Sequence, residues 1–199
     1  MNGLSLIFIA VLLLVSSGNL IAESEKILPE QKIYTAAAFG SDGRLWRIIP
    51  SQKYVSVDYS TDYGKSFGQA IRLNPTDMPI HLWDENPPAI SVDREGRVYV
   101  LYFADDQQSS TSFFSHSDNG TLFSAPIKIS SEANTWYHYQ TEMLVDAKNR
   151  IHFIWHDTRD RAEYKKQGGG DLSIYHASAK TKTIEAPFSD QRIAKNICS

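Results

Sequence analysis

Four segments of the chain carry side chains that could bind or react with a polar ligand. They combine aromatic rings with carboxylates, histidines and arginines: His81, Trp83, Asp84 and Glu85; Asp105 and Asp106; Trp136, Tyr137, His138 and Tyr139; and Asp157, Arg159, Asp160, Arg161, Glu163 and Tyr164. The C–H faces of a sugar stack on aromatic rings, and its hydroxyls need hydrogen-bond partners. These segments therefore predict a site for a glycan or another polar ligand.

From these segments we predict one set of ligand-binding residues, namely His81, Trp83, Asp84, Trp136, Tyr137, His138, Arg159 and Arg161. A plainer interpretation stays open for the tryptophans, which would then pack between sheets, and for the charges, which would then be solvated. Asp157 and Arg159 could likewise form a local ion pair that fixes the base of their loop, with His156 nearby. We predict no cofactor and no metal, because the carboxylates lack the spacing of a defined calcium loop.

A unit of about fifty residues must position these segments. Its signature is an Asp-x-x-Gly/Asn-Arg hairpin, shortened in the first copy, and its arginines Arg44, Arg97 and Arg150 are each 53 residues apart. Each unit holds short apolar runs separated by turn residues, which is typical of one four-stranded blade of a β-propeller. We therefore predict an all-β fold with three antiparallel four-stranded blades, at about 31–74, 87–130 and 141–195. Outside the N-terminal leader, no stretch has an apolar stripe at helical spacing.

The topology of such a blade separates the loops into two sets. In an antiparallel four-stranded meander, the first-to-second and third-to-fourth turns share one end. The other end collects the remaining loops, and these are the long ones that hold the candidate residues: 74–88, 105–110, 130–141 and 157–171. Long loops on a rigid sheet scaffold are where binding groups usually gather.

A turn motif lies between the third and fourth predicted strands of the first unit. The segment Ser60-Thr61-Asp62-Tyr63-Gly64-Lys65-Ser66-Phe67 resembles the Asp-box, or BNR repeat, of sialidase-like propellers, with Ser60, Asp62, Gly64 and Phe67 at the motif positions. A weaker copy at 116–123 keeps Asp118, Gly120 and Phe123, with His116 in place of the serine. In the third unit Ser178 falls where the aspartate is expected, and Phe188 alone could supply the aromatic ring. The motif is structural first, since its aspartate accepts backbone N–H bonds and its glycine supplies a positive φ.

The resemblance implies the neuraminidase superfamily fold, whose propellers have six blades, so residues 23–199 look like half of one. Either two copies assemble into a ring, or the chain is a truncated product. Open blade edges also leave self-association as a prediction.

The resemblance further implies the site of an exo-sialidase, with an Asp acid/base, a Tyr nucleophile beside a Glu, and three arginines around the substrate carboxylate. Asp157, Glu163 and Tyr164 are the catalytic candidates, but neighbours on an extended segment point to opposite sides. The long loops carry only Arg159 and Arg161, and Ser51–Lys53 offers no Asp acid. Arg47-Ile48-Ile49-Pro50 is similar to the family's Arg-Ile-Pro element but follows the Gly43 hairpin instead of preceding it.

These departures favour a module that binds a glycan without autonomous hydrolysis, although whether the chain is an enzyme stays open. One alternative is a glycoside hydrolase of sialidase type whose site is completed by a second copy or a missing C-terminal half. Another is a scaffold or fragment without a site.

The ends and the charge of the chain predict its compartment and exclude some partners. The apolar run Leu4–Val15 and the small residue Ala22 predict a signal peptide over 1–22, hence a secreted or periplasmic protein that is free of the membrane after cleavage. A net charge of −3 gives no reason to expect nucleic acid as a partner. The single cysteine, Cys198, forms no intramolecular disulfide, and whether it pairs between chains stays open.

Overall fold

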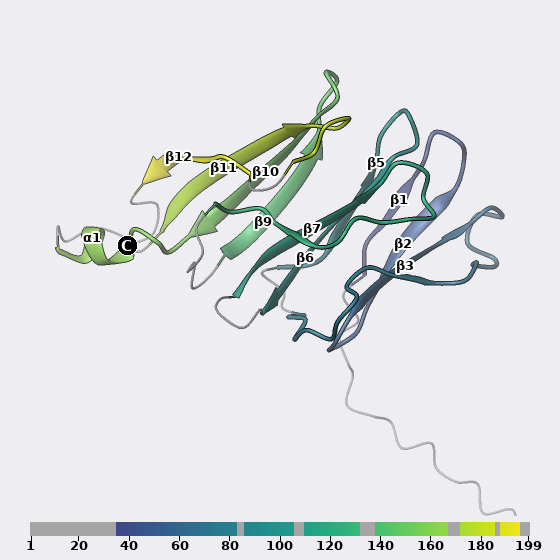
Figure 1. Ribbon diagram of the computed structural model, residues 1–199, viewed down its shortest axis with the longest axis horizontal. Helices are drawn as coiled ribbons and strands as arrows, with labels where there is room; N and C mark the ends of the chain where they lie inside the picture. The colour runs from purple at the N-terminus through teal and green to yellow at the C-terminus, as the bar shows by residue number, and fades with distance from the viewer. Residues whose placement is uncertain are drawn as a thin grey trace, which may run out of the picture. The chain divides into compact units, whose positions relative to one another are not determined.

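The computed structural model describes residues 35–82, 86–105, 110–131, 138–166, 172–185 and 188–195, all within one compact unit, Ile33–Ser199. In these ranges the chain forms three four-stranded antiparallel sheets and one short helix (Figure 1). The predicted all-β class, with three four-stranded blades, is confirmed. The signal peptide predicted over 1–22 and Cys198 lie outside the described residues.

Each sheet is a meander in which strands pair in chain order. The first consists of β1 (Ala37–Phe39), β2 (Leu45–Pro50), β3 (Val55–Ser60) and β4 (Ile71–Arg72). The second consists of β5 (Ala89–Val92), β6 (Val98–Asp105), β7 (Ser110–Ser117) and β8 (Ile127–Lys128). The third consists of β9 (His138–Val145), β10 (Arg150–Asp157), β11 (Ser173–Lys180) and β12 (Asp190–Lys195).

Two departures from the predicted elements bear on the site. β9 begins at His138, whereas the predicted strand began at Glu142, and a register shift opposite Ile154 and His156 accommodates the added residues. The loop after β10 contains helix α1 (Arg161–Lys166), where no helix was predicted. Six residues make fewer than two turns, too few to show an apolar stripe at helical spacing.

The recurring hairpin signature is explained by its turn chemistry. Asp93 accepts the backbone N–H of Arg97 at 3.0 Å, and Asp146 accepts that of Arg150 at 2.9 Å. The residue before each arginine has a positive φ, +82° at Gly96 and +57° at Asn149. Glycine and asparagine are the residues that adopt this conformation most readily. Each turn thus closes a hairpin between the first and second strands of its sheet.

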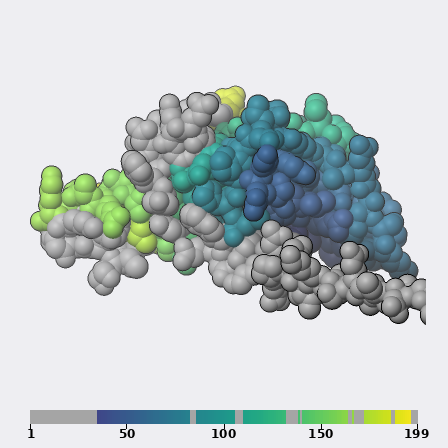
Figure 2. Space-filling model, turned by 90° about the horizontal axis from the view of Figure 1, so that it is seen from below, coloured from purple at the N-terminus to yellow at the C-terminus, as the bar shows by residue number. Residues whose placement is uncertain are grey.

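Two apolar cores join the three sheets. Between the first and second sheets, Trp46 and Ile48 pack with Val98, Val100 and Tyr102, and the space-filling view shows the first sheet in blue directly against the second in teal (Figure 2). The second core lies between the second and third sheets, and its members are Tyr99, Leu101, Phe114, Ile129, Ile151, Phe153, Trp155, Tyr175, Ala177 and Phe188. Alternate residues of β6 therefore enter different cores, because successive side chains of a strand point to opposite faces.

Within the described ranges, none of the helical structure is long or apolar enough to cross a membrane.

Candidate functional site

Aspartates end the second strands of two sheets, and each contacts a histidine. Asp105 ends β6, and its Oδ1 lies 2.8 Å from His81 Nε2. Asp157 ends β10, and its Oδ2 lies 3.5 Å from His138 Nε2. Each aspartate is the last residue before a long loop that leads to the next, antiparallel strand of its sheet. Both pairs therefore lie at the end of the sheets that holds the long loops.

The backbone places the two pairs at the same end of their sheets but one residue out of register, since Ala104, 53 residues before Asp157, is its counterpart. His138 is the residue of β9 that pairs with Asp157 of β10. In the second sheet β5 starts only at Ala89, and residues 79–81 take the corresponding place: Ile80 bridges Ala104, and the Asp105 N–H donates to Pro79 O at 2.9 Å. Two different chain paths thus bring a histidine to the same end of a second strand.

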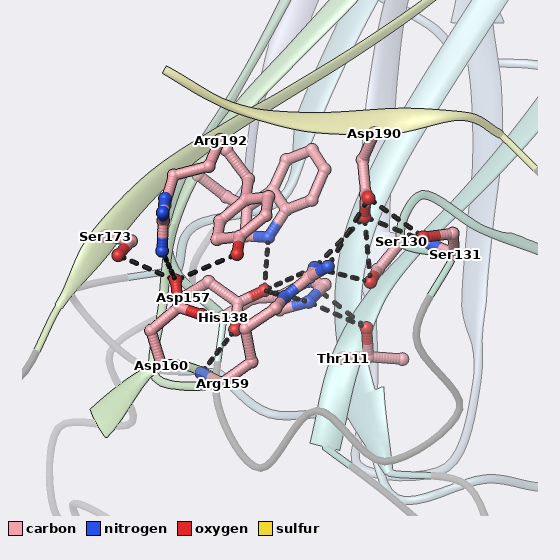
Figure 3. Close-up of polar contacts among 12 residues, drawn as sticks. Thr111, Ser130, Ser131, His138, Asp157, Arg159, Asp160, Ser173, Asp190 and Arg192 are labelled. Atoms are coloured by element: carbon pink, nitrogen blue, oxygen red, sulfur yellow. Dashed lines mark hydrogen bonds and ion pairs between the residues drawn. The ribbon is translucent and has the colours of Figure 1, made fainter. Parts of the chain in front are cut away.

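The pair in the third sheet belongs to a buried polar cluster (Figure 3). Asp157 is fully buried, with Oδ1 accepting the backbone N–H of Arg159 at 2.8 Å. Its Oδ2 accepts Trp155 Nε1 at 2.9 Å and Arg159 Nη2 at 2.7 Å. Both oxygens are therefore occupied by donors of the protein, so Asp157 is not placed to act on a substrate as the sequence analysis suggested.

Arg159 connects this cluster to the neighbouring sheet. Its Nη2 lies 3.0 Å from Asp190 Oδ2 and donates to Ser130 Oγ at 2.9 Å, while its guanidinium lies 3.8 Å from the centre of the Tyr175 ring. Burial disfavours the charge, but the bonds to Asp157 and Asp190 outweigh burial and raise the pKa of Arg159 above its usual value. These contacts favour the interpretation of Asp157 and Arg159 as an ion pair that fixes the loop, instead of a ligand-binding arginine.

His138 is enclosed in the same cluster. Its Nδ1 lies 3.2 Å from Thr111 Oγ1, and its backbone oxygen accepts Asn86 Nδ2 at 2.8 Å. Burial lowers the pKa of His138 to about 4, and the nearby Asp157 offsets that effect only in part. The ring is fully buried, so a ligand at the surface does not reach it. We therefore replace the predicted ligand-binding role of His138 by a structural one.

A second polar group, which the sequence analysis missed, lies beside the first. Asp160 Oδ2 accepts Tyr175 Oη at 2.8 Å and Ser173 Oγ at 2.9 Å, and Arg192 Nη1 lies 3.2 Å away. Burial and the bond to Asp160 raise the pKa of Tyr175, so the phenol is held protonated as a donor. Asp160 was already among the candidate residues of its loop, but the local sequence does not reveal that it meets Tyr175 and Arg192.

The remaining candidates are distributed as follows. Arg161 and Glu163 are exposed residues of α1, and Tyr164 belongs to the same helix. The segment that holds Glu163 and Tyr164 is therefore helical and not extended. Trp83, Asp84, Trp136 and Tyr137 lie outside the described residues.

The accessible pair at the long-loop end is His81 with Asp105. The Asp105 side chain is 34% exposed and that of His81 is 19% exposed, in contrast to the fully buried Asp157 and His138. Ser110 Oγ donates to Asp105, and the His81 ring meets Phe103 edge-on at 5.2 Å between centroids. The pair thus offers a held carboxylate to a polar ligand, while His81 Nε2 is buried against it. Within the described ranges, no three His, Cys, Asp or Glu side chains are grouped so that they could hold a metal ion.

The predicted Asp-box turn of the first sheet, Ser60–Phe67, lies at the opposite end. Ser60 Oγ donates to Asp62 Oδ1 at 2.6 Å and accepts the Gly64 N–H at 2.8 Å, and Asp62 Oδ1 accepts the Ser66 N–H at 2.9 Å. The bonds from the Ser60 and Ser66 hydroxyls lower the pKa of Asp62 to about 2. Gly64 has a φ of +85°, as the turn requires.

The second turn differs from the predicted alignment by one residue. Ser117 Oγ, not His116, accepts the Gly120 N–H at 2.9 Å, and Asn119 Oδ1 accepts the Thr121 N–H at 2.9 Å. Asn119 therefore takes the part assigned to Asp118, which is exposed. The physical reason is a shorter turn, in which the glycine is three positions after the serine, whereas in the first turn it is four positions after it.

The aromatic residues of the turns lie in different surroundings. Phe123 packs against the core between the first and second sheets, and Phe188 is buried in the core between the second and third. Phe67 is partly exposed, with the Arg47 guanidinium 3.5 Å from its ring centre. Ser178 lies within β11, where its hydroxyl accepts Arg150 Nη2 at 2.6 Å.

Comparison with known proteins finds relatives by structure alone. No family model and no curated protein matches the sequence. Among solved structures, a protein of unknown function from Dyadobacter fermentans matches with a TM-score of 0.50 at 14% identity, covering 79% of this chain and 40% of that one. The GH93 α-L-arabinofuranosidase of Fusarium graminearum, in complex with arabinobiose, matches with a TM-score of 0.53 at 14% identity, covering 82% and 50%.

A third match is the ulvan lyase that represents polysaccharide lyase family PL25, with a TM-score of 0.54, 11% identity, and coverage of 83% of this chain and 44% of that chain. At these identities the likeness shows the fold: this chain has sheets arranged as in propeller-type proteins. It spans between 40% and 50% of the length of these three structures.

Proposed function

We propose that this chain is a secreted, sialidase-like propeller module that binds a glycan at its long-loop end without hydrolysing it on its own. The observation that carries the proposal is the partly exposed His81–Asp105 pair. The pair at the same end of the third sheet is buried and holds its loop, whereas the Asp105 side chain here is 34% exposed. The Asp-box turn at Ser60–Phe67 supports the sialidase-like part of the proposal, and the apolar run Leu4–Val15 supports secretion.

Two of the structural relatives suggest the ligand class. They are complexes with arabinobiose and with a fragment of glucuronic acid and sulfated rhamnose. A carboxylate beside an imidazole suits the hydroxyls of such ligands, because bonds that involve charged groups are the stronger ones.

The absence of autonomous hydrolysis is argued from the carboxylates. Most glycosidases use two carboxyl groups that flank the scissile bond. Asp157 is buried with both oxygens bonded, and Asp160 is engaged by Tyr175, Ser173 and Arg192. Of the other exposed carboxylates on these loops, Asp77 is bonded to Arg72 at 2.7 Å and Glu163 lies on α1, between β10 and β11 of the third sheet. A hydrolase reading would need that second group from elsewhere, such as a second copy.

Calorimetric titration with neutral and uronic acid-containing oligosaccharides tests the proposal. Removing one charged hydrogen-bond partner typically costs about 1.5–3 kcal/mol, so Asp105→Asn should weaken binding by roughly tenfold or more. Lys148→Ala, an exposed change in the hairpin turn between β9 and β10, is the matched control and should leave affinity unchanged. No reducing sugar should appear on prolonged incubation. Binding that is absent, or equal in both variants, would overturn the assignment of this end.

A further inference from the structure

A groove lies between the Asp-box turns of the first and second sheets, at the end opposite to the His81–Asp105 pair. It has a volume of about 750 Å³, within the range of small-ligand sites. Its wall comes from the segment between β3 and β4 on one side and from Gly120 and Thr121 on the other. We propose that this groove is a second binding site, for an uncharged saccharide.

The lining of the groove carries no formal charge. Two rings, Tyr59 and Phe67, face it together with the polar side chains of Thr61, Ser66, Gln69 and Thr121. The guanidinium groups beside it, of Arg44 and Arg47, are already paired with Asp42 and Asp58. A charged ligand would therefore leave water without a full countercharge, which is unfavourable. A neutral sugar matches it, since rings accept its C–H faces and hydroxyls and amides accept or donate its hydrogen bonds.

The polar groups of the lining are of two kinds: hydroxyls that already donate their proton within the protein, and groups whose hydrogen-bonding capacity is still unused. Ser66 Oγ donates to Asp62 at 2.6 Å, and Thr121 Oγ1 donates to Asn119 at 2.8 Å, so both hydroxyls keep lone pairs for a ligand. The Tyr59 and Thr61 hydroxyls and the Gln69 amide have no hydrogen-bond partner within the described residues. A saccharide hydroxyl both donates and accepts, and therefore uses both kinds of group.

The walls are held in place before a ligand arrives. Guanidinium groups fix the two rings, with Arg47 3.5 Å from the Phe67 ring centre and Arg44 5.0 Å from that of Tyr59. A Cβ added at Gly120 would lie 2.7 Å from the Trp46 ring, so the second turn rests directly on the first sheet. Preorganised walls lower the entropy cost of binding.

Exposed apolar side chains occur in the same two turns. Tyr63, in the turn of the first sheet, is 82% exposed and has a φ of +60°, a conformation that is uncommon for a residue other than glycine. Leu122, in the turn of the second sheet, is 78% exposed. An aromatic ring exposed beside a neutral groove is a further platform for a sugar ring.

The test uses the full chain and titrations with arabinobiose and xylotetraose as neutral probes and tetragalacturonic acid as the anionic one. The double variant Thr61→Ala, Gln69→Ala should weaken binding of a neutral probe at least tenfold, with an unchanged melting temperature. Lys148→Ala, an exposed change in a hairpin turn of the third sheet, is the matched control. Asp105→Asn should remove only the component of binding that belongs to the long-loop end and should leave the groove component intact, which separates the two sites.

Four outcomes overturn the proposal. The first is that neither neutral probe binds at millimolar concentration, and the second is that the double variant binds a neutral probe as well as the control does. The third is that the anionic probe binds in the groove as well as the neutral probes do. The fourth is that an extended peptide binds in the groove in place of a sugar. Neutral binding that is lost with Asp105→Asn alone would assign the sugar to the long-loop end and reject the groove.

Discussion

At the residue scale, the same pair of residue types has two different outcomes in this molecule. His138 and Asp157 are fully buried, and burial keeps the imidazole neutral despite the carboxylate 3.5 Å away. His81 and Asp105 are 2.8 Å apart and partly exposed. Solvation, more than the identity of the side chains, thus separates a structural histidine from one that is available to a ligand.

The buried histidine predicts a pH dependence of stability. Its pKa is about 4 in the folded protein and near 6.5 when unfolded, so the unfolded chain binds the extra proton between these values. Stability from this group is therefore complete above pH 6.5 and is lost as the pH falls toward 4. From pH 7 to pH 5 the loss should be about 2 kcal/mol, which urea denaturation at the two pH values measures.

The matched variants are His138→Gln and His156→Gln, the latter at a partly exposed position of β10. His138→Gln should be less stable at pH 7 and should lack this part of the pH dependence, since the group that titrates is gone. His156→Gln should follow the original protein. If all three proteins lose the same stability between pH 7 and pH 5, the buried imidazole is not the source.

At the element scale, what could be predicted from the sequence was local. Strands were recognised because alternation and turn residues act within a few positions, and the Ser60–Phe67 turn because its serine, aspartate and glycine bond one another. The second turn was misaligned because a one-residue shortening leaves the same residue types in sequence. Helix α1 was missed because it is too short for a periodic signal.

Contacts between distant elements were beyond the sequence pattern. Arg159 was recognised as a partner of Asp157, two residues away, but its second carboxylate, Asp190, is 31 residues away on β12. The Asp160–Tyr175 bond likewise joins α1's preceding turn to the middle of β11. Such pairs depend on how strands align and on a bulge in β12 between the partners of Ile174 and Tyr175, neither of which local chemistry specifies.

The polar cluster predicts a large cost for removing its arginine. Arg159→Ala leaves the buried carboxylates of Asp157 and Asp190 without their cation, which typically costs about 3 to 5 kcal/mol. The control is Arg44→Ala, which removes a pair with Asp42 whose side chains are 25% and 40% exposed and should cost below about 1 kcal/mol. Denaturant unfolding of both variants makes the comparison; equal, small losses would show that the cluster does not anchor the loop.

At the scale of the whole molecule, the third sheet repeats the second but leaves one face exposed. Leu101 of β6 is buried against the third sheet at 2% exposure, and Ile154, 53 residues later on β10, is 42% exposed. Leu144 and Ile193 of the same sheet are also exposed, at 65% and 52%. His152 lies between these apolar residues and bonds His176 at 3.0 Å and Asp146 at 3.1 Å.

This face predicts self-association of the chain. The two cores between the sheets bury apolar side chains, but the apolar side chains of this face remain in water. A second copy that covers them removes that surface from solvent. Light scattering after size-exclusion chromatography should then give a mass above that of one chain. Ile154→Lys places a charge in the face and should weaken association at least tenfold without lowering the melting temperature, because the position is already exposed.

Tyr63→Lys is the control, because it also replaces an exposed apolar side chain by a charged one, but in a turn of the first sheet. This variant should associate like the original protein. Association that both variants weaken alike would indicate nonspecific attraction between apolar residues, and a single-chain mass at every concentration would contradict the prediction. If only Ile154→Lys separates the copies, the far face of the third sheet is the contact, and a second copy is then positioned to extend the row of sheets beyond the third.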